Sequence, residues 1–288
     1  GTMNRLRSEI KHNFLKQIIF RLDYEGIMDS DIEKCIVSLR ETFLHAGFKK
    51  MENRTENQFD VQIKMDLNIS DDNAFSINNN NKSIVYSFYS EKKEILEISK
   101  NFFTLTVDID EEHGYQRFDK YVNLLAESIK NIKEISPYFQ VQRIGLRKIN
   151  ICLLQDLNKV PNYFTNAAFN IKEVVDQFEE CDCLASNIVT VFTKDKYQVN
   201  YVRNIQQGIV KEDDRRETTT YQIVLDVDVF KEGNREILPL LIDVENIKSI
   251  LETQNTIEFE IFIKSLNDEF ITELKQDVFK DSAIKGVI

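Results

Sequence analysis

Arg143–Asn150 reads RIGLRKIN, and this stretch decides the fold class that the sequence predicts. It lies inside an expected strand, Phe139–Leu153, in which successive side chains point to opposite faces of a sheet. One face of that strand carries two guanidinium groups with a glycine between them, so it is a candidate cradle for an anion. Alternation assigns these residues to that face: Val141, Arg143, Gly145, Arg147 and Ile149.

Outward from this strand, the chain alternates between apolar strands and amphipathic helices. Period-two patterns predict further strands at Lys16–Tyr24, Asp60–Met65, Ser83–Ser90, Glu94–Ser99, Phe102–Asp110, Asn187–Thr193, Lys196–Arg203 and Thr219–Phe230. Helical spacing predicts helices at Ile32–His45, Tyr115–Ile135, Leu240–Thr253 and Ile257–Phe279. Meandering strands outnumber crossovers, which predicts an α+β fold of mostly antiparallel sheets flanked by amphipathic helices. Two lobes, 1–154 and 155–288, are expected to pack as one unit, because no linker rich in Pro, Gly or Ser separates them.

The chain is acidic, with 48 acidic and 37 basic residues and a formal net charge of −11. Nucleic-acid binding needs a basic face, so a nucleic-acid partner is not expected. No window approaches the roughly 18 consecutive apolar residues of a membrane span, so no membrane partner is expected either. Cys181 and Cys183 are close in sequence but lack the further ligands of a zinc site. We therefore expect no metal, and reduced thiols in a cytoplasmic protein.

The two arginines allow two interpretations. Arg143 and Arg147 stand roughly 13 Å apart along the strand, and their long side chains can converge on one phosphate, whose oxygens match the guanidinium fork. Alternatively, both arginines pair with acidic residues of neighbouring strands. Gly145 has its own alternatives, a β-bulge or a close packing point beside an aromatic ring.

An Asp-x-Asp pattern occurs on two expected strands, as Asp108 with Asp110 and as Asp226 with Asp228. Two carboxylates at i and i+2 can hold magnesium for phosphoryl transfer. No glycine-rich phosphate loop accompanies either pair, so neither a cofactor nor a catalytic residue is assigned. Asp226 and Asp228 share their face with apolar residues, so we expect them to be partly buried and to need an arginine partner.

Two apolar tracts, Phe14–Phe20 and Ile84–Tyr89, predict either core strands or edge strands through which a second subunit or a partner continues the sheet. A third pattern, Glu258 and Glu260 with Lys264, resembles the Glu-x-Glu-x-Lys pattern of triphosphate-tunnel enzymes. The lysine comes two positions late and the segment has helical spacing, so we reject that interpretation.

Several segments together resemble one known family. They are Glu94–Ser99 (EILEIS), Phe103–Leu105 (FTL), Arg143–Asn150, Leu225–Phe230 (LDVDVF) and the C-terminal helix. The chain is similar to a sporadically distributed family of uncharacterised prokaryotic proteins of about this length, whose signature runs Arg-Ile-Gly-Leu-Arg-Tyr-Ile-Asn. Lys148 replaces the usual tyrosine here. The resemblance implies no activity, cofactor or catalytic residue, and the family's patchy distribution is similar to that of genes on mobile or defence islands.

These observations lead to alternative functions. The first is a non-enzymatic interaction or regulatory protein, acting as a homo-oligomer or with a protein partner, including a component of a mobile-element or defence system. The second is a nucleotide- or phosphate-binding module, including a magnesium-dependent enzyme, with Arg143, Arg147, Asp226 and Asp228 as its site. The third is acidic mimicry of nucleic acid, which predicts carboxylates clustered on one surface.

Overall fold

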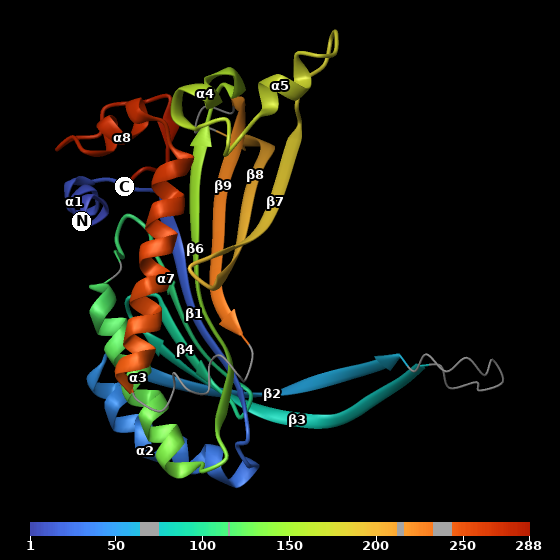
Figure 1. Cartoon of the computed structure of the whole chain (residues 1–288), viewed down its shortest axis with the longest axis vertical. Helices are drawn as coiled ribbons and strands as arrows, with labels where there is room; N and C mark the ends of the chain where they lie inside the picture. The colour runs from blue at the N-terminus through green and yellow to red at the C-terminus, as the bar shows by residue number, and fades with distance from the viewer. Residues whose placement is uncertain (64–74, 115, 212–215, 233–243) are drawn as a thin grey trace.

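The described residues form one ten-stranded antiparallel sheet with flanking helices, which confirms the predicted α+β fold. The structure, a computed structural model, describes residues 1–63, 75–114, 116–211, 216–232 and 244–288 (Figure 1). Nine strands follow the order β2-β3-β4-β5-β1-β6-β9-β8-β7, and β10 pairs with β6. Their bounds are β1 Leu15–Glu25, β2 Phe48–Ile63, β3 Phe75–Ser90, β4 Glu94–Ile98, β5 Phe102–Asp108, β6 Gln140–Leu154, β7 Ala185–Lys194, β8 Tyr197–Lys211, β9 Glu217–Glu232 and β10 Ile284–Lys285.

The helices α2, α3 and α7 lie on one side of this sheet and pack against it (Figure 1). The helix bounds are α1 Thr2–Glu9, α2 Asp29–His45, α3 Phe118–Ile135, the 3-10 turn η1 Leu157–Lys159, α4 Val160–Tyr163, α5 Ile171–Val175, α7 Val244–Ser265 and α8 Asp268–Leu274. We name the sheet face toward these helices the inner face and the opposite one the outer face. Because β6 pairs with both β1 and β9, the two expected lobes share one continuous sheet.

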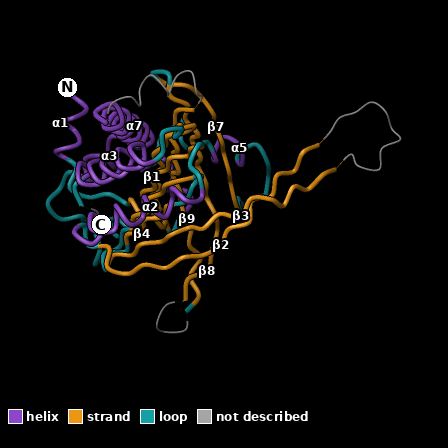
Figure 2. The backbone as a smooth tube through the Cα atoms, turned by 90° about the horizontal axis from the view of Figure 1, so that it is seen from below, coloured by secondary structure: helices purple, strands orange, loops and turns teal. Residues whose placement is uncertain are grey.

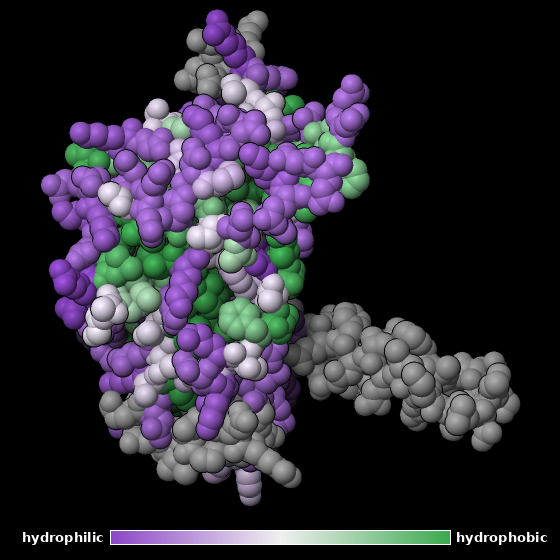
Figure 3. All heavy atoms as spheres, turned by 45° about the horizontal axis from the view of Figure 1, so that its top comes forward, coloured by the Kyte–Doolittle hydropathy of each residue, from purple (hydrophilic) through white to green (hydrophobic). Residues whose placement is uncertain are grey.

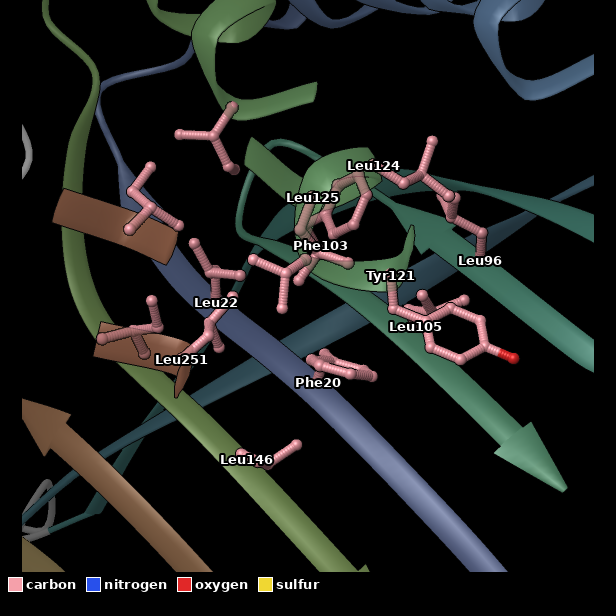
Figure 4. Close-up of a cluster of buried hydrophobic side chains, with 14 of the residues drawn as sticks. Phe20, Leu22, Leu96, Phe103, Leu105, Tyr121, Leu124, Leu125, Leu146 and Leu251 are labelled. Carbon is pink, nitrogen blue, oxygen red and sulfur yellow. The ribbon is translucent and has the colours of Figure 1, made fainter. Parts of the chain in front are cut away.

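The core forms where alternating side chains of the central strands meet the three helices. From β1, Phe20 and Leu22 point inward and pair with Leu146 and Ile144 of β6. Figure 4 shows this cluster, including Leu251 of α7 beside the strands. A second cluster gathers the apolar side chains of α4, α8 and the far ends of β6 and β9. Burial of the inner face explains why buried and more exposed side chains alternate along much of β1 and β9.

A β-bulge corrects the predicted face of one residue. Along β6, Asp23 pairs with Arg143 but the next residue of β1, Tyr24, pairs with Val141. The extra residue, Gln142, reverses the alternation, so Val141 turns to the inner face and is buried in the core. The prediction that Val141 shares the face of Arg143 is therefore wrong.

The apolar tracts lie in the interior of the sheet. β1 runs between β5 and β6, and β3 runs between β2 and β4. The core alternative for these tracts is confirmed, and the edge-strand alternative is wrong. The described edges of the nine-strand path are β2 and β7.

Some elements are longer than the sequence patterns predict. β2 and β3 pair as far as Ile63 and Phe75, and this hairpin projects from the body as an arm (Figure 2). The polar, asparagine-rich residues 68–82 are typical of a loop, but residues 75–82 are strand, because continued pairing satisfies their backbone groups. Residues 64–65 of the predicted strand Asp60–Met65, residues 68–74 of the polar stretch and residues 240–243 of the predicted helix Leu240–Thr253 lie outside the described residues. The predicted break between the two C-terminal helices, after Thr253, is wrong, because α7 continues through Asn255 and Thr256 to Ser265. The second helix, α8, begins only at Asp268.

The surface is mainly hydrophilic on the side seen in Figure 3, with apolar side chains gathered toward its middle. Across the helices that the structure describes, none combines the length and apolarity that a membrane crossing requires.

Candidate functional site

The predicted arginines and aspartates meet on the outer face, across β6 and β9. Arg147 donates from Nε and Nη2 to the two carboxylate oxygens of Asp226, at 2.8 and 2.5 Å. Arg143 donates from Nη2 to Asp228 at 2.8 Å. The structure thus brings all four predicted residues together, as two diagonal ion pairs. These contacts agree with the counter-ion alternative, since each guanidinium already has a carboxylate partner.

Gly145 makes the longer of the two diagonals possible. It lies opposite Phe230 in the β6–β9 pairing, between the positions of Arg143 and Arg147. A Cβ on Gly145 would come within 3.2 Å of the Phe230 Cβ and 3.3 Å of the Arg143 Nη1. The missing side chain lets the Arg143 guanidinium lie over the Phe230 ring, 4.2 Å from its centroid. The predicted close packing of Gly145 beside an aromatic ring is confirmed.

The ion pairs continue onto β1 and form a row across three strands. Asp23 lies 4.0 Å from Arg143 Nη1 and accepts hydrogen bonds from Arg21. Burial raises the pKa of Asp228, and the charge of Arg143 opposes that rise. The hydrogen bonds that Arg147 donates to Asp226 raise the pKa of Arg147. With three arginines and three aspartates, the row is formally neutral, which favours a role in joining strands.

The other Asp-x-Asp pair stays apart from this row. Asp108 accepts a hydrogen bond of 2.7 Å from Gln17, and Asp110 pairs with Lys93 and His113. The hydrogen bond from Lys93 holds the pKa of Asp110 well below its usual range. Within the described ranges, no three His, Cys, Asp or Glu side chains gather closely enough to hold a metal ion.

The four cysteines are free thiols. Cys35 and Cys152 are buried, and burial raises the pKa of Cys35 to about 11. Cys181 is exposed and Cys183 is partly exposed.

A second polar cluster lies on the inner face, where sequence reasoning assigned no site. Lys148 donates to the side-chain oxygen of Asn255 in α7 at 2.5 Å, and Arg7 of α1 donates to the Asn255 backbone oxygen at 3.0 Å. Glu258, one turn further along α7, is 2% exposed, and its Oε1 makes no hydrogen bond with the described residues. Gln254 donates to the Ile144 backbone oxygen at 2.9 Å.

Removal from water shifts the pKa of Lys148 and of Glu258 in this cluster. Desolvation lowers the pKa of Lys148 to about 8, and it raises the pKa of Glu258 well above its usual range. A signal for this cluster was present in the sequence: Lys148 and Asn150 occupy inward positions that follow Ile144 and Leu146. Polar residues in an apolar alternation indicate a buried polar site.

Replacing Glu258 with glutamine is expected to change how stability depends on pH. The folded-state pKa of Glu258 lies above its ordinary value of 4.5, so the folded protein holds this proton more tightly than the unfolded chain. The contribution of the protonated Glu258 carboxyl to the free energy of unfolding of the wild type is therefore lost as pH rises above about 4.5. Relative to wild type, the Glu258→Gln variant should gain free energy of unfolding between about pH 4.5 and 7, measured by urea titration at each pH.

Glu260 on the same helix provides a matched control. Hydrogen bonds from Lys264 and Lys194 lower the pKa of Glu260, so Glu260→Gln should lose relative stability as pH rises through about 4. If the free energies of unfolding of Glu258→Gln and wild type change in parallel with pH, the inferred burial of the Glu258 carboxyl is contradicted.

The two edges of the sheet differ in their protection. On β2, charged side chains such as Lys50, Glu52 and Arg54 line the described edge. β7 carries no charged residue before its last position, Lys194. Its Val189 and Val191 are 54% and 58% exposed. Natural edge strands use charge to block pairing with other chains, so β7 is an unprotected edge.

Comparisons with known proteins assign no family. No protein-family model matches the sequence, and no curated protein matches it. A solved structure of the S. pombe Pct1 RNA triphosphatase in complex with the Spt5 CTD aligns over 96% of this chain and 90% of its own, at 7% identity. Its TM-score of 0.13 is too low for any argument about fold or function. The family resemblance of RIGLRKIN remains a prediction.

Proposed function

We propose that this chain is a non-enzymatic interaction protein that self-associates through the open edge of its sheet. The observation that carries the proposal is β7, a ten-residue edge strand with exposed valines and no charge before Lys194. Among the described strands, β7 is the last of the sheet on this side (Figure 1). An edge of this kind offers unpaired backbone groups to a further strand, and burial of its valines adds to the association.

The partner that best suits the β7 edge is a second copy of the same chain. Symmetric dimers place the same surface on both subunits, so an antiparallel β7–β7 contact closes after two chains. If the two-fold axis passes Thr190, Val189 of one copy lies opposite Val191 of the other. Such a contact pairs apolar side chains and sets no like charges against each other, because the segment Ala185–Thr193 is uncharged.

Phosphate or nucleotide binding at Arg143, Arg147, Asp226 and Asp228 remains the alternative prediction. An incoming phosphate would have to displace the aspartates from guanidinium groups that they already satisfy. The geometry therefore favours the interaction protein, and an edge contact also suits assembly with a protein partner.

Replacing Val191 with lysine is expected to weaken the β7–β7 contact. The wild-type protein should form a dimer of 33.8 kDa chains, measured by light scattering over a concentration series. Val191→Lys places a like charge on both sides of a symmetric interface and should weaken the dimer by about tenfold or more. Met51→Lys on β2 is the matched control, since Met51 is 53% exposed on the other edge and should leave the dimer intact.

Two results would refute the proposal. One is a wild-type mass that stays monomeric throughout the series. The other is a dimer that Met51→Lys disrupts and Val191→Lys leaves unchanged, because that outcome places the contact on β2.

A further inference from the structure

A small cavity lies between α1, α7 and the inner face of β1 and β6. Its volume is about 180 Å³. A dry apolar cavity of about 150 Å³ is large enough for benzene, so this one accommodates a ring-sized molecule. The cavity is lined by Arg7, Ile10, Asn13, Leu15, Lys148, Asn150, Glu258, Phe259 and Phe262.

The walls of the cavity differ in character. One part is apolar, formed by Leu15 and Ile10 with the rings of Phe259 and Phe262. The other carries the cationic side chains of Arg7 and Lys148. The Arg7 guanidinium lies over the Phe259 ring, 4.6 Å from its centroid, so the charged and apolar parts adjoin.

Glu258 supplies an observation that points to a ligand. It is 2% exposed, it lines the cavity, and its buried Oε1 has no hydrogen-bond partner among the described residues. A buried polar atom without a partner costs on the order of 1–3 kcal/mol, so a bound group that satisfies it is favoured. Because burial raises the pKa of Glu258, the neutral form of this carboxyl is favoured, and it can donate to an anionic oxygen.

We propose that this cavity binds a small organic carboxylate, with its anionic group between Arg7, Lys148 and Glu258 and its apolar body against Phe259 and Phe262. Two cations facing a neutral acid favour an anion, although the whole chain carries a net charge of −11. The apolar wall favours an organic acid over an inorganic anion, because an inorganic anion has no apolar surface to bury against it. This site lies on the inner face and is independent of the β7 edge.

Benzoate is the probe that matches the cavity in size and charge. Isothermal titration of the full chain should show saturable binding, with a Kd of about 1 mM or tighter. Benzamide, which has the same size and no charge, should bind at least about tenfold more weakly, because it lacks the charged hydrogen bonds. Inorganic phosphate at equal ionic strength should not displace benzoate.

Variants then test the position of the site. Lys148→Met should weaken benzoate binding by about tenfold or more, whereas Lys264→Met, an exposed lysine of α7, should leave it unchanged. Glu258→Gln keeps a neutral donor and should bind within a few-fold of wild type. If Lys148→Met unfolds, as circular dichroism would show, Phe262→Leu replaces it and should also weaken binding, since it removes part of the apolar wall.

The proposal is overturned if benzoate does not bind, or if benzamide binds equally well, because the charged wall then plays no part. Displacement by phosphate would overturn it as well, in favour of an inorganic-anion site. Equal binding by wild type and by the Lys148→Met or replacement Phe262→Leu variant would place benzoate elsewhere.

Discussion

A Gly145→Val variant is expected to lose about 3 kcal/mol of the free energy of unfolding, the upper end of what overpacking of a core costs. The new Cβ would lie 3.2 Å from the Phe230 Cβ and 3.3 Å from the Arg143 Nη1, and the two methyl groups of valine add further bulk. Valine favours a strand over glycine by roughly 0.5–1 kcal/mol, so propensity and packing act in opposite directions here. Packing dominates because the Phe230 Cβ is held close to the backbone of β9.

Gly208→Val separates these two effects. Gly208 also lies in a strand, but a Cβ there would meet only the Thr220 backbone oxygen at 3.9 Å. This variant should be neutral or gain up to about 1 kcal/mol, in urea unfolding followed by circular dichroism. An equal loss of the free energy of unfolding in Gly145→Val and Gly208→Val would contradict the claim that the missing side chain of Gly145 is needed for packing against Phe230.

An Arg143→Met variant is expected to lose about 2 kcal/mol, because it leaves Asp228 without its nearest cation. The side chains of Arg143 and Asp228 are only 23% and 21% exposed, so water replaces the lost contact poorly. Methionine keeps an unbranched stem over Phe230, which confines the change to the charge. The loss of Arg143 should also raise the pKa of Asp228 further, since the charge of Arg143 now lowers it.

A double-mutant cycle measures this pair directly. Arg143→Met with Asp228→Asn should give a coupling energy of about 1–2 kcal/mol. The Arg117–Asp119 pair is the comparison, with side chains 79% and 51% exposed, and its cycle should give less than about 0.5 kcal/mol. A coupling energy for Arg143 and Asp228 as small as that of the surface pair would contradict their role in joining β6 to β9.

Alternation in the sequence predicted the strands around RIGLRKIN and placed Arg143, Gly145 and Arg147 on one face, because strand periodicity is local. The bulge at Gln142 was not predictable, since it arises from the pairing of β6 with a distant strand. The choice between core and edge for β1 stayed open for the same reason: topology sets the neighbours of a strand, and an apolar tract has the same pattern in a core strand and at an apolar edge.

The site was predictable to the extent that its chemistry is local. Partly buried aspartates need cations, and this argument alone paired Asp226 and Asp228 with the arginines of another strand. The inner cavity depends on three segments far apart in sequence, α1, β6 and α7, so no single window contains it. Lys148 at an inward position was its local sign in the sequence, whereas Arg143 and Arg147 beside it directed the predicted site to the outer face.

The most direct test of self-association is amide hydrogen exchange of β7 at low and at high protein concentration. A β7–β7 contact places hydrogen bonds on backbone groups that are unpaired in the monomer, so exchange slows only when the dimer forms. We predict slower exchange in peptides from Ala185–Lys194 at high concentration, with no change in peptides from Phe48–Glu56 of β2. Self-association through β7 would be contradicted if β7 exchanges at the same rate at both concentrations while the measured mass shows a dimer at the higher one.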